Sequence, residues 1–388
     1  MAHIYGLDAA SLKVAEEAAV IAREVASKHA ADVDEKARFP EESMAALAAA
    51  GFYGLCVPTE LGGKGLGPRA FVAVVEELAQ VCSSTAMVFV MHVTALQAVA
   101  SSKTLADRDA ILRAAAQGKH LTTLAFSEKG SRSQFWAPVS KMVAKGDGFV
   151  TQAFKSWVTS AARADSFVSS AQKPDAASPM ESTVYLARKG AKGLRIAAGF
   201  DGLGLRGNDS APMSFEDYEI AKGDLISELG AGAGTMLEVV LPWFAMGTSV
   251  MANGLCRAAV AATSKHLSGT GFDHTQSSLR DIPVLRARIA EMNVRTEQAR
   301  ALVGYLLSHM DAPDATTPLY VLQARLASMQ AAVDVTDLGM KACGGAAFSK
   351  HLPLERLFRD ARAGWVMAPT VDHLQEFVGR ALTGLPLF

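Results

Sequence analysis

The spacing of apolar residues changes twice along the chain and divides it into three parts. From residue 7 to about residue 117 the spacing is helical, with one apolar face formed by Val14, Ala18, Ile21 and Val25. Between residues 118 and 229, short apolar or alternating runs separated by Gly, Pro, Asp and Ser predict strands. Helical spacing then returns and is clearest from residue 282 to 306. The pattern predicts an α+β protein.

We expect three domains with the ranges 1–119, 120–229 and 230–388. A chain of 388 residues is long enough for two or three domains and a large core. The first domain is predicted to be all-helical, with clear helices at 69–80 and 84–100. The second is predicted to be a β domain with strands at 121–126, 149–154, 166–171, 182–187 and 212–220. The third is predicted to be helical.

Composition excludes several classes of function. Half of the residues are hydrophobic, but no apolar run reaches the ~20 residues of a membrane span, so we expect none. The formal net charge is −1 with dispersed Lys and Arg, which argues against nucleic acid as a partner. The 4 cysteines form no CxxC pair, which favours reduced thiols and no metal site. With no secretion signal at the N-terminus, we expect a cytoplasmic protein.

The stretch from Cys343 to His373 carries the most specific signal. It contains the pair Gly344-Gly345, then P-x-E-R-x-x-R-D-A from Pro353, and then Thr370, which is a good helix N-cap. This order resembles the C-terminal signature of acyl-CoA dehydrogenases. The resemblance spans nearly the whole chain and implies that family's fold: an N-terminal helical domain, a middle β-barrel-like domain and a C-terminal four-helix bundle.

Two further segments resemble the flavin motifs of the same family. Residues 124–134 (LAFSEKGSRSQ) resemble the motif T-E-P-x-x-G-S-D, with Ser127 and Ser133 kept, and residues 155–160 (KSWVTS) resemble K-x-W-I-T-N. Each alone has a simpler interpretation, a Ser/Gly turn in the first segment and a core tryptophan in the second. A third segment, 202–207, formally matches GxGxxG, but a strand-like run follows it where a dinucleotide fold needs a helix. We therefore expect no nicotinamide site there.

The resemblance implies FAD as cofactor and an oligomer, either a homotetramer or a homodimer. By position in the family motifs, the residues that it implies at the cofactor are Phe126, Ser127, Ser133, Trp157, Thr159, Lys341, Gly344, Gly345, Thr370 and Asp372. Ser127 keeps the hydroxyl that in the family bonds the flavin pyrimidine edge. Trp157 can cover a flavin face, and Thr159 can donate to the N5 edge. Lys341 replaces a glutamine that in the family faces the cofactor of the neighbouring subunit.

The catalytic base is where this sequence departs from the family. Most members place a glutamate two residues before the capping threonine, which is Ala368 here, and a minority place it at a position that is Phe244 here. Neither side chain can take a proton. The remaining candidates are Asp372, which has a second interpretation as a helix-dipole charge, and His92, which has one as a core histidine. Glu238 is a further carboxylate nearby.

Two functions follow from the resemblance. The first is an oxidoreductase acting on an acyl-CoA or related thioester, with an atypical or absent general base and a separate electron acceptor. The second is a two-component flavin monooxygenase of the same fold, served by a flavin reductase partner and using oxygen. A non-catalytic scaffold is less favoured, because the hydroxyls of Ser127 and Thr159 remain.

Overall fold

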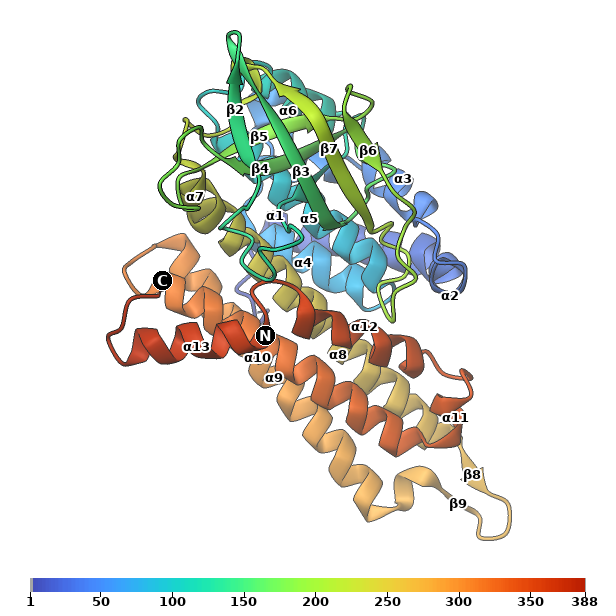
Figure 1. The fold of residues 1–388 in the computed structure, drawn as a ribbon. Coiled ribbons are helices and arrows are strands. Elements are labelled where there is room, and N and C mark those ends of the chain that lie inside the picture. The colour runs from blue at the N-terminus through green and yellow to red at the C-terminus, as the bar shows by residue number, and fades with distance from the viewer. Residues whose placement is uncertain (1–2, 388) are drawn as a thin grey trace.

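The structure, a computed structural model, describes residues 3–387 and shows three regions packed on one another (Figure 1). Residues 1, 2 and 388, which the expected outer domains include, lie outside the described part. The sheet occupies the top of Figure 1, the N-terminal helices lie behind it, and the C-terminal helices run diagonally below. The predicted α+β class and three-part architecture are confirmed.

The N-terminal region is helical, as predicted. Its α-helices are α1 (Ala9–Ile21), α2 (Ser27–Glu35), α3 (Glu41–Ala49), α4 (Pro68–Ala79), α5 (Ser83–Ser101) and α6 (Arg108–Ala116). The side chain of Asp8 caps α1 by accepting a hydrogen bond from the Ser11 N–H at 2.7 Å. Helix α5 is apolar on all sides and is buried along nearly its whole length. It passes beneath the sheet and supplies one wall of the site described below.

The middle region is one curled sheet of β1 (Thr122–Ala125), β2 (Lys141–Lys145), β3 (Gly148–Val158), β4 (Ser166–Gln172), β5 (Ser182–Arg188), β6 (Leu194–Ile196) and β7 (Ala211–Ile220). The strand order is β1-β4-β2-β3-β7-β6, with β5 also paired to β4. The expected strands are present, and the apolar pattern missed β2 and β6. Strand β2 is missed because only Met142 of its residues is buried, so its alternation is masked by exposed lysines.

The C-terminal region is built from the long helices α8 (Leu241–Gly269), α9 (Pro283–Asp311) and α10 (Thr317–Cys343), with α12 (Leu354–Val366) packed along them. The short helix α11 (Gly345–Phe348) follows α10, and α13 (Val371–Leu382) closes the chain. A small hairpin, β8 (Gly271–Phe272) with β9 (Ser277–Ser278), connects α8 to α9 and was not predicted.

One carboxylate joins the N-terminal region to this bundle. Glu76 of α4 is buried and accepts a hydrogen bond from the Tyr5 hydroxyl at 2.5 Å. It also pairs with Arg257 of α8 and Arg300 of α9, each at 2.9 Å. Because both oxygens are satisfied, the buried charge is compensated, and the two helical regions are held in a fixed relation.

Two helices among the described residues are long and apolar enough to cross a membrane. They are Ser83–Ser101 and Gly232–Gly269, and 89% and 78% of their most apolar windows are buried inside the protein. Core helices pass the same test of length and composition, so the expectation of no membrane span stays a prediction.

Candidate functional site

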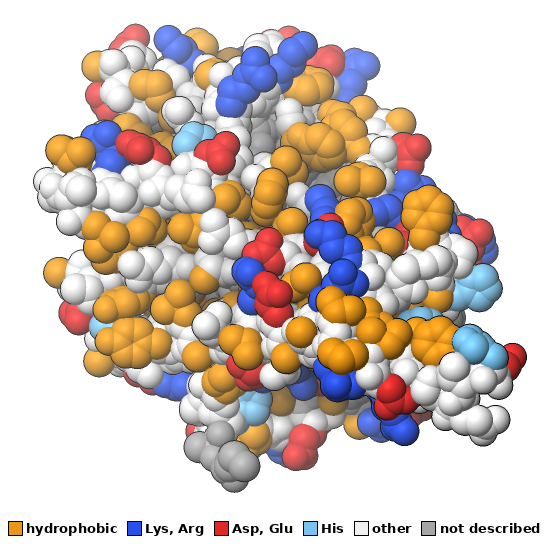
Figure 2. Space-filling view, turned by 90° about the horizontal axis from the view of Figure 1, so that it is seen from below, with side chains coloured by type: hydrophobic (Ala, Val, Ile, Leu, Met, Phe, Trp, Pro, Cys, Tyr) orange, Lys and Arg blue, Asp and Glu red, His pale blue; other side chains and the backbone are white. Residues whose placement is uncertain are grey.

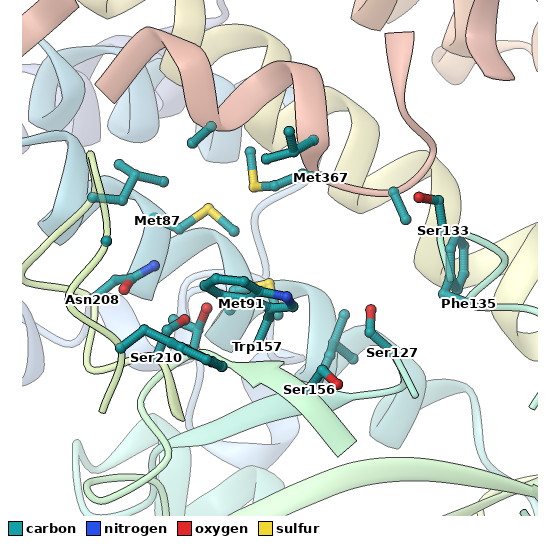
Figure 3. A pocket seen from close by; sticks show the side chains of 18 of the residues that line it. Met87, Met91, Ser127, Ser133, Phe135, Ser156, Trp157, Asn208, Ser210 and Met367 are labelled. Atoms are coloured by element: carbon teal, nitrogen blue, oxygen red, sulfur yellow. The ribbon is translucent and has the colours of Figure 1, made fainter. Parts of the chain in front are cut away.

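A cavity of about 1020 Å³ lies where the sheet meets α5, α8 and α12 (Figure 3). This is at the upper end of the range for small-molecule sites. In Figure 3, Ser127, Ser133 and Phe135 lie on one side and Asn208 and Ser210 on the other. Met87 and Met367 lie across the cavity from Trp157. Most of the lining surface is apolar, and the rest is formed by hydroxyl, amide and charged groups.

A β-bulge directs Trp157 into this cavity. The pairing of β3 with β7 shifts between Lys155 and Val158, so that strand β3 has one extra residue there. Trp157 lies in the bulge with φ of 55°, an uncommon conformation for a large side chain. Its indole stacks on the ring of Phe200, with ring centroids 3.9 Å apart and planes 25° apart. The side chain is nevertheless 60% exposed, so the bulge presents a planar aromatic surface to the cavity.

The loop that carries Ser127 and Ser133 is fixed by a buried ion pair. Glu128 accepts hydrogen bonds from the Val139 and Ser140 N–H groups and from Lys155 Nζ, at 2.7, 2.9 and 2.5 Å. Lys155 is 0% exposed and also donates to the Ser170 carbonyl at 2.7 Å. Although burial alone would raise it, the Lys155 charge and these hydrogen bonds hold the pKa of Glu128 below its usual value. The Glu128 carboxylate is therefore ionised and holds the loop in place through these hydrogen bonds.

Positive side chains surround the cavity. Arg206 and Arg359 are already paired, with Asp201 and with Asp34 and Glu355 respectively. Lys129, Arg132 and Arg362 also line it, and none of the three has a carboxylate within ion-pair distance among residues 3–387. Arg362 already donates to the Thr336 hydroxyl and the Phe358 carbonyl, so Lys129 and Arg132 are the cations that suit a ligand with phosphate groups.

The cavity lining contains Ala368 and Phe244, the two positions where the resemblance places a base. Among its described lining residues there is no His, Asp, Cys or Tyr, and the one carboxylate is Glu128. Because Glu128 already accepts from Lys155 and two backbone N–H groups, no carboxylate of the lining is free to act as a general base.

His92 lies outside this lining. It is 0% exposed; its Nε2–H donates to the Tyr53 carbonyl at 3.1 Å, and its Nδ1 accepts from the Thr122 N–H at 3.2 Å. Burial lowers its pKa to about 4. With both nitrogens used by the backbone, the placement supports the alternative interpretation of His92 as a core histidine.

His92 should make stability depend on pH. A depressed folded pKa means that the unfolded chain binds more protons between pH 6.5, the ordinary value, and pH 4. The contribution is therefore full above pH 6.5 and is lost as pH falls to 4, at about 1.4 kcal/mol per unit, or roughly 3 kcal/mol in all. We expect urea titrations of His92→Gln to show a smaller loss across this window than the unchanged protein. The exposed His274→Gln is the control, and equal losses in both variants would contradict the assignment.

The structure does not bring the other predicted residues to this cavity. Thr370 caps α13 by accepting from the His373 N–H at 3.3 Å, and Asp372 is exposed in the first turn of that helix. Lys341 pairs with Asp337 at 2.5 Å at the far end of α10, next to Gly344 and Gly345. Glu238 is exposed and also outside the lining. Phe126, Ser127, Ser133, Trp157 and Thr159 are the predicted cofactor residues that the cavity gathers.

Sequence reasoning missed several lining residues. Met87 and Met91 belong to the apolar run of α5, and Arg359 and Arg362 belong to α12. Residues 202–206 of the run 202–207 line the cavity, and β7 follows the run with no helix, as expected. Its glycines together with Arg206 were the available signal for a ligand loop. No group of three or more His, Cys, Asp or Glu among the described residues is placed to hold a metal.

Three family models match the chain in sequence. They are the acyl-CoA dehydrogenase N-terminal domain at residues 9–119, the middle domain at 123–218 and the C-terminal domain at 230–382. The chain is 26% identical over 366 residues to a probable acyl-CoA dehydrogenase, fadE25, of Mycobacterium leprae, covering 93% of this chain and 92% of that protein. It is 28% identical over 335 residues to a short-chain specific mitochondrial acyl-CoA dehydrogenase of Bos taurus, covering 86% and 80%.

A similar fold is found in butyryl-CoA dehydrogenase from Megasphaera elsdenii. The TM-score is 0.91 at 19% identity, covering 97% of this chain and 99% of that one. Fold and relatives together define an oxidoreductase of the flavoenzyme class. Within that class, the chain belongs to the acyl-CoA dehydrogenase family.

Proposed function

We propose that this protein is an FAD-dependent oxidoreductase that acts on a CoA-type thioester without a carboxylate base at either usual family position. The observation that carries the proposal is the composition of one cavity. It gathers Ser127, Ser133, Trp157 and Thr159 of the flavin motifs, while Ala368 and Phe244 occupy the base positions.

The residues present fit FAD. The exposed indole of Trp157 offers a flat surface for an aromatic ring system, and Ser127 and Thr159 offer hydroxyls beside it. Lys129 and Arg132, which have no carboxylate within ion-pair distance among residues 3–387, suit diphosphate oxygens. When bound, FAD supplies a two-electron acceptor for the substrate.

The side chains of the cavity then bind and orient the substrate and exclude water. Met87, Met91, Val240 and Phe244 form an apolar wall that suits an acyl group. Because the lining has no histidine and no free carboxylate to remove an α-proton, we propose that this task falls to water or to the substrate, or that the natural reaction does not need it. Simple saturated acyl-CoAs should therefore bind to the cavity but be oxidised slowly.

A second candidate is the two-component monooxygenase, which the same lack of a base favours. Oxygen would be the co-substrate, and a separate flavin reductase would be the partner. In the first candidate the partner is instead an electron acceptor.

The proposal also includes three domains, a location and an oligomeric state. The domain ranges are 1–119, 120–229 and 230–388, the location is cytoplasmic, and the oligomer is a homotetramer or a homodimer.

An oligomer would also give roles to residues far from the cavity. We propose that Lys341, Gly344 and Gly345 contact the cofactor of a neighbouring subunit. Seen from below, the molecule has groups of hydrophobic side chains between its charges (Figure 2). Exposed large apolar residues of the C-terminal region include Tyr305, Phe348, Trp365 and Val366.

Anaerobic mixing with a panel of acyl-CoAs tests the first candidate. The purified protein should be yellow and bind butyryl-CoA or octanoyl-CoA with a shift in flavin absorbance, followed by slow bleaching. Product that forms only with oxygen and an added reductase would favour the monooxygenase. If the purified protein takes up neither FAD nor FMN, both candidate functions are wrong.

A further inference from the structure

Arg325 of α10 is a fully buried cation without an anion. Its side chain is 0% exposed, and no carboxylate lies within ion-pair distance of it among residues 3–387. One terminal nitrogen donates to the Thr248 hydroxyl and the other to the Met367 carbonyl at 3.1 Å. Its Nε has no hydrogen-bond partner among the described residues. All of its partners are neutral.

This arrangement is unlike the other buried cations of the protein. Lys155, the one other Lys or Arg in the described part that is equally buried, pairs with Glu128. Arg300, which is nearly buried, pairs with Glu76 and Glu297. A buried charge without a counter-charge destabilises the folded state, and burial accordingly lowers the pKa of Arg325 to about 9. If Arg325 only filled space, an apolar residue of similar volume would give the folded state equal or greater stability.

Arg325 lies directly behind the apolar wall of the cavity. Its guanidinium carbon is 4.7 Å from the centre of the Phe244 ring, and Phe244 lines the cavity. Met367, whose carbonyl it binds, also lines the cavity and precedes Ala368. Figure 3 shows Met367 and Met87 on the same side of the cavity, across from Trp157. The uncompensated charge is thus one side chain away from the space for an acyl group, beside both missing base positions.

We propose that Arg325 recognises a carboxylate on the acyl group of the substrate, at the end remote from the thioester, with the Phe244 ring turning aside to let the two groups meet. The carboxylate supplies the anion that the fold leaves out. The inference rests on the proposed function, because it takes a thioester to be the molecule that enters the cavity.

Titrations of flavin absorbance under nitrogen test the proposal. Succinyl-, glutaryl- and adipyl-CoA are each compared with the methyl-terminated thioester of similar length, such as valeryl-CoA for glutaryl-CoA. The best carboxylate-bearing thioester should bind at least about tenfold more tightly than its neutral counterpart, a difference of ~1.4 kcal/mol. Arg325→Met should abolish this preference while leaving the affinity for valeryl-CoA within about threefold. Arg325→Lys, which keeps the charge, should retain part of the preference. Free glutarate should bind far more weakly, because it lacks the CoA contacts.

The results separate the inference from the proposed function. If valeryl-CoA binds but glutaryl-CoA has no advantage, or if Arg325→Met keeps the advantage, the inference is wrong and the proposed function stands. If no thioester binds, both fall.

Thermal unfolding without ligand gives a second, independent test. Arg325→Met should unfold at or above the temperature of the unchanged protein, because it removes an uncompensated buried charge. Arg300→Met, which leaves Glu76 without one of its two arginines, should unfold at a lower temperature. A comparable fall for Arg325→Met would show a structural role and would overturn the inference.

Discussion

Ala368→Glu is expected to oxidise butyryl-CoA about 100-fold faster than the unchanged protein. The substitution places a carboxylate in the lining of a cavity that has no free base, and a positioned general base contributes typically 10²–10⁴-fold. The rate is read from the anaerobic bleaching of bound FAD after rapid mixing. We expect the lower part of the range, because the neighbouring side chains are not adapted to hold the new carboxylate.

Ala363→Glu is the matched control, since Ala363 lines the same cavity from α12 but does not correspond to a base position. It should leave the rate within a few-fold of the unchanged protein. Phe244→Glu tests the second family position in the same assay. If the unchanged protein already reacts as fast as Ala368→Glu, a base exists elsewhere, and Asp372→Asn and Glu238→Gln are the next variants to measure.

Lys155→Met is expected to lower the free energy of unfolding by about 3–5 kcal/mol and to weaken FAD binding. The substitution leaves Glu128 buried without its cation, and loss of one partner of a buried ion pair typically has this cost. Because Glu128 also holds the Val139 and Ser140 N–H groups, the loop that bears Ser127 should lose its fixed position. Urea unfolding of the FAD-free protein measures the first effect, and a flavin titration measures the second.

Lys145→Met is the control for this experiment. Lys145 is in the adjacent strand β2 and pairs with Glu219 at 2.7 Å, but both side chains are mostly exposed. Exposed pairs contribute about 0.2–1 kcal/mol, and neither stability nor flavin affinity should change much. If the two lysine variants lose the same stability, the buried pair does not have the role assigned to it.

The sequence predicted the elements whose burial is regular. Helix α5 and strands such as β4 appear as apolar runs of the right length, and their bounds differ from those expected by only a residue or two. The short motifs around Ser127 and Trp157 were also informative, because two segments far apart in sequence line one cavity.

Features that depend on pairing across the fold were not predictable from local pattern. The bulge that turns Trp157 into the cavity is set by the register of β3 against β7, which no single strand records. The sequence singled out His92 as a candidate site residue and did not single out Arg325, and in both cases the surroundings set by the fold decided the outcome. The ring nitrogens of a histidine on a helix beside the cavity hydrogen-bond only to backbone groups, whereas an arginine in an ordinary helical run proves to be buried behind the cavity wall.

The stack of Trp157 on Phe200 gives the protein an optical reporter. Of its 4 tryptophans, Trp157 lines the cavity, whereas Trp136, Trp243 and Trp365 are not among the lining residues. A flavin stacked on the indole would quench the fluorescence of Trp157. The stacking on Phe200 restricts the motion of the indole ring, so that its emission should change mainly when the flavin binds or leaves. Loading and release of the cofactor can thus be followed by the intrinsic fluorescence of the protein, with Trp157→Phe as the reference that records the emission of the other three tryptophans.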